Sequence, residues 1–131
     1  MFYPRALSLV ALPQTMAICQ LESSAQVPEW ALDGGFLSVT RTPDELSIVC
    51  PEANVLESTK CERGWRCLKV DGPLDFALTG ILASLVDPLA NAGIGVFVLS
   101  TYTTDYLLIK EKDVEQTVQA LVENGHSVHL P

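Results

Sequence analysis

Residues 65–110 read WRCLKVDGPLDFALTGILASLVDPLANAGIGVFVLSTYTTDYLLIK, and their hydrophobic pattern changes from that of a strand to that of a helix and back. Residues 65–70 alternate well enough for a strand, which Asp71-Gly72-Pro73 ends. Apolar residues then recur at spacings of three and four, which predicts an amphipathic helix that begins near Leu74 or Asp75. Gly93 suits the left-handed position that follows such a helix. The apolar stripe consists of Ile81, Leu82, Leu85, Val86 and Leu89.

The segments that follow complete a recognisable motif. Residues 94–101 are rich in β-branched side chains and predict a strand, which a polar turn at 102–104 joins to a return strand at 105–110. Asp113 and Gln116 form a capping-box pattern at the start of a second helix, and residues 127–130 read as a last short strand. The order is strand, helix, strand, strand, helix, strand, which is the split-βαβ arrangement with two helices on one face of an antiparallel sheet.

The first half of the chain follows the same plan in a reduced form. We expect strands at residues 7–12 and 16–21, a short helix within 23–32 and a hairpin that joins 36–40 to 46–50. The second helix is reduced to a turn near residues 52–55. The sequence therefore predicts an α+β fold of two ferredoxin-like (βαββαβ) units with antiparallel sheets. Residues 1–63 form the degenerate unit and residues 64–131 the complete one.

The charge balance argues against two classes of partner. The 131 residues carry sixteen acidic and eight basic side chains, for a formal charge of −8. Nucleic-acid binding needs clustered Lys and Arg to displace counterions from phosphates, and an anionic membrane surface would repel this chain. We expect neither nucleic acid nor membrane as a partner.

The cysteines and histidines favour no metal site and no cofactor. Zinc sites draw on tightly spaced cysteine pairs, and the closest pair here is Cys61 and Cys67. Cys19 and Cys50 lie in apolar, strand-like runs, where cysteine behaves as a small hydrophobic residue. Free thiols fit a reducing compartment, so we expect a cytoplasmic protein. His126 and His129 flank the last strand without a third ligand, and we expect both at the surface.

Catalytic motifs are missing from the sequence. It has no G-x-S-x-G elbow, no glycine-rich phosphate loop and no H-E-x-x-H pair. We therefore expect that the protein is not an enzyme.

Five stretches of the C-terminal half carry a family resemblance. They are residues 72–76 (GPLDF), 79–82 (TGIL), 88–94 (PLANAGI), 99–102 (LSTY) and 104–108 (TDYLL). This pattern resembles the ACT domain family of amino-acid-sensing modules. The closest subtype is that of small bacterial tandem-ACT proteins, aspartate kinase regulatory regions and animal arginine sensors. Residues 30–32 and 36–42 resemble the N-terminal unit of the same small proteins. In the C-terminal half the chain departs from the pattern, because Tyr106 stands where several relatives carry His.

The resemblance implies a ligand site where the first strand of the motif meets its first helix. Free N–H groups of that helix would bind a carboxylate, and Asp105 would pair with a ligand ammonium. Two ordinary roles compete with this interpretation: Asp75 as a helix cap, and residues 100–105 as a simple polar turn. The candidate ligand-binding residues are Gly72, Pro73, Leu74, Asp75, Phe76, Leu99, Ser100, Thr101, Thr104 and Asp105.

Two hypotheses about function follow from the sequence. The first is a regulatory module that senses a small molecule, an amino acid, and acts through a partner protein or by self-association as a homodimer. The second is an assembly module that forms a homodimer and binds no ligand.

Overall fold

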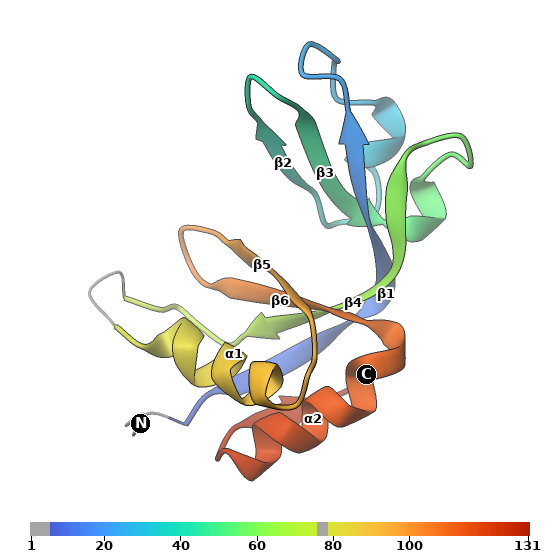
Figure 1. The fold of residues 1–131 in the computed structure, drawn as a ribbon. Coiled ribbons are helices and arrows are strands. Elements are labelled where there is room, and N and C mark those ends of the chain that lie inside the picture. The colour runs from blue at the N-terminus through green and yellow to red at the C-terminus, as the bar shows by residue number, and fades with distance from the viewer. Residues whose placement is uncertain (1–5, 76–78) are drawn as a thin grey trace. The chain divides into compact units, whose positions relative to one another are not determined.

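The structure, a computed structural model, describes residues 6–75 and 79–131, and these group into two compact units (Figure 1). The C-terminal unit contains the described residues up to Pro13 together with Arg66–Pro131, and the N-terminal unit is Gln14–Trp65. Two long strands, β1 (Ser8–Leu21) and β4 (Cys61–Val70), each contribute to both units.

The C-terminal unit has a mixed sheet with helices on one face (Figure 1). Its strand order is β7-β1-β4-β6-β5, where β5 is Val96–Ser100, β6 is Asp105–Lys110 and β7 is Ser127–His129. The hairpin of β5 and β6 is antiparallel and pairs Ser100 with Asp105. The helices are α1 (Ile81–Asn91) and α2 (Val114–Glu123), and the short 3-10 helix η3 (Glu111–Asp113) leads into α2.

A leucine-rich core joins the helices to the sheet. Five of its leucines, taken from five different elements, are at most 1% exposed, and each contributes about 1.5 to 3 kcal/mol of burial free energy. They are Leu9 on β1, Leu68 on β4, Leu85 on α1, Leu107 on β6 and Leu121 on α2. The α+β class and the split-βαβ order of the C-terminal half are therefore confirmed.

The start of α1 differs from the expectation. The helix begins at Ile81, after Gly80 in the left-handed conformation at φ 74°, and not at Leu74 or Asp75. Leu74 lies outside the helix, and its N–H donates to the Thr103 carbonyl oxygen at 2.8 Å. The other end of the helix agrees with the expectation, since Gly93 has φ 74° directly after the terminal residue Ala92.

The first strand is also different from the expectation. Instead of two strands separated near Pro13, the chain forms one strand, β1, with Pro13 exposed within it. The first part of β1 pairs in parallel with β7, Ser8 opposite Ser127, and supplies Leu9 and Ala11 to the C-terminal core. Residues 6–13 thus group with the second half of the chain, whereas the linear division at residues 63 and 64 assigns them to the first.

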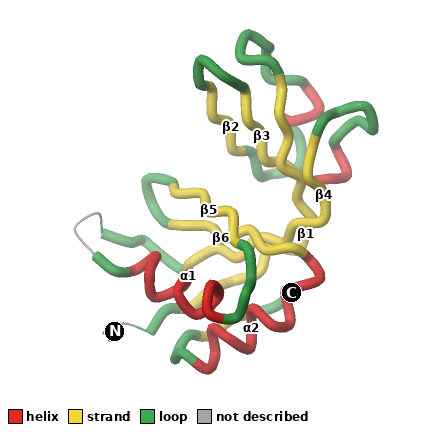
Figure 2. The backbone as a smooth tube through the Cα atoms, in the orientation of Figure 1, coloured by secondary structure: helices red, strands yellow, loops and turns green. Residues whose placement is uncertain are grey.

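The N-terminal unit is the reduced version of the motif. Its strand order is β2-β3-β1-β4, where β2 is Ser38–Arg41 and β3 is Leu46–Pro51. The expected hairpin is present, but the expected helix within residues 23–32 is one 3-10 turn, η1 (Glu29–Leu32). A second 3-10 turn, η2 (Glu52–Asn54), matches the expected turn near residues 52–55. Figure 2 shows that helical structure in this unit is limited to such short turns.

Candidate functional site

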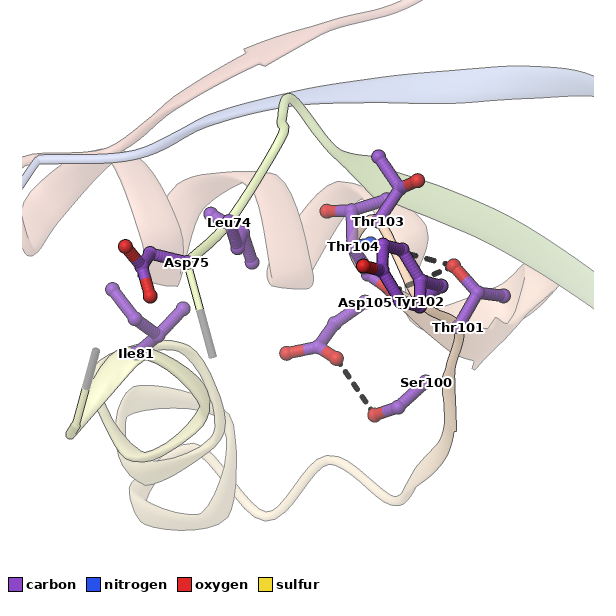
Figure 3. Close-up of a pocket in the computed structure, with 9 residues that line it drawn as sticks. All are labelled: Leu74, Asp75, Ile81, Ser100, Thr101, Tyr102, Thr103, Thr104 and Asp105. Atoms are coloured by element: carbon purple, nitrogen blue, oxygen red, sulfur yellow. Dashed lines mark hydrogen bonds between the residues drawn. The ribbon is translucent and has the colours of Figure 1, made fainter. Parts of the chain in front are cut away.

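The β5–β6 turn in the C-terminal unit has a fixed geometry. The Thr101 N–H donates to the Thr104 carbonyl oxygen at 2.9 Å, and the Thr104 N–H donates back to Thr101 Oγ1 at 3.3 Å. Across the ends of the two strands, Ser100 Oγ donates to Asp105 Oδ1 at 2.6 Å (Figure 3). The turn therefore holds the Asp105 carboxylate in a defined position.

The same turn is joined to the segment that follows β4. Thr104, which is 3% exposed, donates from Oγ1 to the Val70 carbonyl oxygen at 2.6 Å. Thr103 accepts the Leu74 N–H, as described above. Gly72 allows a close approach at this junction, because a Cβ there would be crowded at 3.2 Å from Thr104 Cβ and 3.3 Å from the Thr103 carbonyl oxygen. These contacts hold residues 71–75 beside residues 101–105.

A pocket of about 230 Å³ lies where these two segments and the start of α1 meet (Figure 3). It is smaller than the roughly 300 to 1,000 Å³ typical of sites for drug-sized ligands, so a small metabolite suits it. Its lining contains two carboxylates and several hydroxyl groups, and no Lys or Arg is among the lining residues. The lining residues are Leu74, Asp75, Ile81, Ser100, Thr101, Tyr102, Thr103, Thr104 and Asp105.

Most of the residues expected at the site lie together in this pocket. Six of them line it: Leu74, Asp75, Ser100, Thr101, Thr104 and Asp105. Gly72, Pro73 and Leu99 are not in the lining, although Gly72 contributes the close approach described above. Phe76 lies outside the described residues. The sequence interpretation missed Ile81, Tyr102 and Thr103; the last two were within the predicted turn and could have been included.

The later start of α1 changes where free helical N–H groups can be expected. Free N–H groups were expected at residues 74–76, but the first intrahelical bond runs from the Ser84 N–H to the Gly80 carbonyl oxygen at 2.9 Å. The N–H groups at the start of a helix have no intrahelical acceptor, and here the capping position is Gly80, which has no side chain to supply one. Because Ile81 lines the pocket, the positive end of α1 borders it.

The N-terminal unit has a comparable turn and a pocket of its own. In the β2–β3 turn the Thr42 N–H donates to the Glu45 carbonyl oxygen at 2.9 Å, and the Glu45 N–H donates to Thr42 Oγ1 at 3.2 Å. This is the hydrogen-bond pattern of Thr101 and Thr104. The adjacent pocket, about 600 Å³ in volume, is lined by Gln20, Leu21, Glu22, Ser23, Ala25, Asp44 and Lys60.

The position of His126 differs from the expectation. It is 6% exposed and not at the surface, whereas His129 is exposed as expected. Its Nδ1 accepts the Leu7 N–H at 3.0 Å, so its proton is on Nε2, which donates to the Ser84 carbonyl oxygen at 3.1 Å. Both bonds stay inside the unit's core, so His126 has a structural role.

No group of three or more His, Cys, Asp or Glu side chains among residues 6–75 and 79–131 has the arrangement of a metal site. No helix in the same ranges is long and apolar enough to cross a membrane.

Comparison with known proteins identifies relatives for both halves. A family model described as the ACT domain matches residues 60–123, and a model for an N-terminal domain matches residues 14–58. The cytosolic arginine sensor for mTORC1 subunit 1 from Bos taurus is 31% identical over 97 residues, which cover 66% of this chain and 30% of that protein. The chain spans 56% or less of the length of the curated relatives it matches first.

Solved structures extend the likeness to the whole chain. The crystal structure of a protein from Agrobacterium tumefaciens is 42% identical with a TM-score of 0.92, and the match covers 97% of this chain and 95% of that one. The aspartokinase alpha and beta subunits match at a TM-score of 0.62 and 14% identity, covering 92% and 98% of the two chains. This second likeness concerns the fold alone.

Proposed function

The chain belongs to the ACT domain family, with the ACT domain at residues 60–123, and from this premise we propose that it is a regulatory module that binds an amino acid. The family's regulatory fold is common to amino-acid sensors and aspartate kinase regulatory regions. Binding would occur in the pocket between the β4–α1 segment and the β5–β6 turn, and would act through a partner protein or through self-association.

One observation carries this proposal. The pocket places a carboxylate, Asp105, and the positive end of α1 at the border of one small cavity. An amino acid carries an ammonium and a carboxylate on the same carbon, so it matches both groups at once. Ser100 supports this role because its hydrogen bond holds the Asp105 carboxylate in place while the other carboxylate oxygen can still accept.

The charge of the lining favours one class of amino acid. Asp75 and Asp105 line the pocket and no basic side chain does, so a ligand with an additional positive charge gains attraction that an acidic ligand loses. We therefore propose the order cationic, then neutral, then acidic amino acids. The name of the related arginine sensor is consistent with a cationic ligand.

The remaining parts of the proposal concern setting and partners. We propose a cytoplasmic, non-catalytic protein that acts without a cofactor and binds neither nucleic acid nor membranes. The acidic net charge of −8 supports the last point. The regulated protein would be a separate chain or a second copy of this one.

A thermal-stability screen tests the proposal. Ligands that bind only the native state raise the unfolding midpoint as their concentration passes the dissociation constant. The purified chain is screened against the twenty amino acids and the common nucleotides, and each positive result is repeated by calorimetric titration. If no amino acid shifts the midpoint at millimolar concentration, amino-acid sensing is rejected.

A second function, assembly without a ligand, has one observation in its favour. β5 is the last strand in the sheet order, and its four apolar residues (96–99) are all partly exposed. An edge strand of this kind can pair with a second copy. Light scattering with and without the amino acids of the screen separates the two functions, because the assembly module is a dimer under both conditions.

A further inference from the structure

Three of the four cysteines lie together in the N-terminal unit, although they are far apart in the sequence. Cys19 is on β1, Cys50 on β3 and Cys61 on β4. All three belong to one hydrophobic cluster of that unit. The fourth, Cys67, is buried in the C-terminal unit.

The strand register explains why these thiols meet. Ala17 pairs with Cys50 and Cys19 pairs with Ile48, so Cys19 and Cys50 are diagonal neighbours on the same buried face. On the other side of β1, the Gln20 N–H donates to the Lys60 carbonyl oxygen at 3.0 Å. Cys19 directly precedes Gln20 and Cys61 directly follows Lys60, so this bond places the two cysteines on adjacent strands. The thiols of Cys50 and Cys61 are close enough to the Cys19 thiol to shift its pKa.

The three thiols differ in exposure and in acidity. Cys19 is 1% exposed and Cys50 is fully buried, whereas Cys61 is only partly buried. The hydrogen bond to Cys50 and burial both raise the pKa of Cys19, and the same bond lowers the pKa of Cys50. Burial raises the pKa of Cys61, and the nearby Arg63 opposes this effect. Cys61 is therefore the thiol that reagents in solution can reach.

We propose that Cys61 and Cys19 form a reversible intramolecular disulfide by exchange with a low-molecular-weight disulfide. The Cys61 thiolate attacks one sulfur of that disulfide, so a mixed disulfide forms and one small thiolate leaves. Cys19 then gives its proton to the released small thiolate and attacks the Cys61 sulfur, and the second small thiolate leaves. The two protein thiols lose two electrons in total, and the small disulfide gains them.

The position of this pair gives the disulfide a local consequence. Gln20 follows Cys19, Lys60 precedes Cys61, and both Gln20 and Lys60 line the pocket of the N-terminal unit. A covalent bond between the adjacent cysteines would fix β1 to β4 directly beside these two lining residues. The redox state of the pair would thus act on the N-terminal unit without involving the pocket proposed for the amino acid.

Mass spectrometry of the oxidised chain tests the proposal. The reduced full-length protein is incubated with glutathione disulfide, quenched with acid and alkylated, and its peptides are mapped without reduction. We expect a loss of two hydrogen atoms per chain and a peptide that links Cys19 to Cys61. Because only the thiolate reacts and burial raises the Cys61 pKa, the rate should rise as the pH is raised above neutral.

Two serine variants provide the comparison. Cys61→Ser changes a partly exposed side chain and should retain the fold, but it should slow oxidation by about tenfold or more because the accessible thiol is lost. Cys67→Ser removes a thiol that is buried in the C-terminal unit and is not part of the three-cysteine cluster, so this variant should oxidise at the wild-type rate. Circular dichroism of both variants verifies that they are folded.

Three results would overturn the proposal. The first is a chain that keeps four alkylatable thiols after prolonged incubation. The second is a Cys19–Cys50 disulfide that forms equally fast in Cys61→Ser. The third is a disulfide between two chains, seen as a dimer on a non-reducing gel. None of these results bears on amino-acid binding in the C-terminal unit, because no cysteine is among the residues that line the pocket of Asp105.

Discussion

His126 donates a hydrogen bond of 3.1 Å from Nε2 to the carbonyl oxygen of Ser84, a residue within α1. In a regular helix this oxygen would accept the N–H of residue 88, but that residue is Pro88, which has no N–H. The histidine therefore satisfies a buried acceptor that the proline leaves open. With Leu7 as the second partner, it joins α1 to the start of β1 through one neutral imidazole.

Replacing this histidine should destabilise the C-terminal unit. His126→Phe keeps an aromatic ring but leaves the Leu7 N–H and the Ser84 carbonyl buried without partners, at a cost of about 2 to 4 kcal/mol. Equilibrium unfolding in urea measures the loss. The exposed His129 is the matched control, and His129→Phe should change the free energy of unfolding by less than about 0.5 kcal/mol.

The relation between His126 and Pro88 predicts a partial rescue. Pro88→Ala restores an N–H that can donate to the Ser84 carbonyl oxygen, so His126→Phe should cost about 1 kcal/mol less in the Pro88→Ala background than in the wild type. A double-mutant cycle from urea denaturation gives this coupling. Strictly additive effects would show that the two residues do not serve the same carbonyl group.

Thr104 should stabilise the junction that positions the candidate pocket. Thr104→Val keeps the shape of the side chain but removes the 2.6 Å bond to the Val70 carbonyl oxygen, so we expect a loss of about 1 to 3 kcal/mol. Thr103→Val, at the exposed neighbouring position, should have little effect on urea unfolding. Equal losses in both variants would contradict the role assigned to the buried hydroxyl.

Thr117 offers a stabilising substitution. Its Oγ1 is buried and has no hydrogen-bond partner among the described residues. Thr117→Val replaces this hydroxyl with a methyl group of similar size, so the free energy of unfolding should rise by about 1 kcal/mol. Thermal and urea denaturation measure the change, and a less stable variant would mean that the hydroxyl is satisfied in solution.

Replacing Asp105 should weaken ligand binding and leave the fold intact. Asp105→Asn removes the charge proposed to pair with an ammonium, so the affinity for any amino acid found in the stability screen should fall by about tenfold or more. Asp44→Asn is the matched control, because Asp44 lines the separate pocket in the N-terminal unit. Calorimetric titration distinguishes the variants, and equal affinity of Asp105→Asn and the wild type would remove Asp105 from the site.

Much of the C-terminal half could be predicted from its local pattern. The α1 stripe from Ile81 to Leu89 and the β5–β6 hairpin follow from hydrophobic spacing, which depends only on neighbours in the sequence. The same reasoning placed Ser100 to Asp105 beside Leu74 and Asp75, because the split-βαβ order fixes which ends of the strands meet. The left-handed Gly93 likewise follows from local helix-ending chemistry.

Other features depend on contacts between distant parts of the chain. Local spacing could not show that β1 would continue through Pro13 and lie between β7 and β4, because the pairing partners of β1 are distant in the sequence, as Ser127 is from Ser8. Leu74 bonds to Thr103 while α1 begins only at Ile81, and the buried His126 bonds to the Ser84 carbonyl that Pro88 leaves open. The sequence by itself determined the order of elements in the C-terminal half, the family and the segments of the candidate pocket. Only the tertiary structure decided which polar groups satisfy each other and that three distant cysteines meet, since both are set by non-local packing.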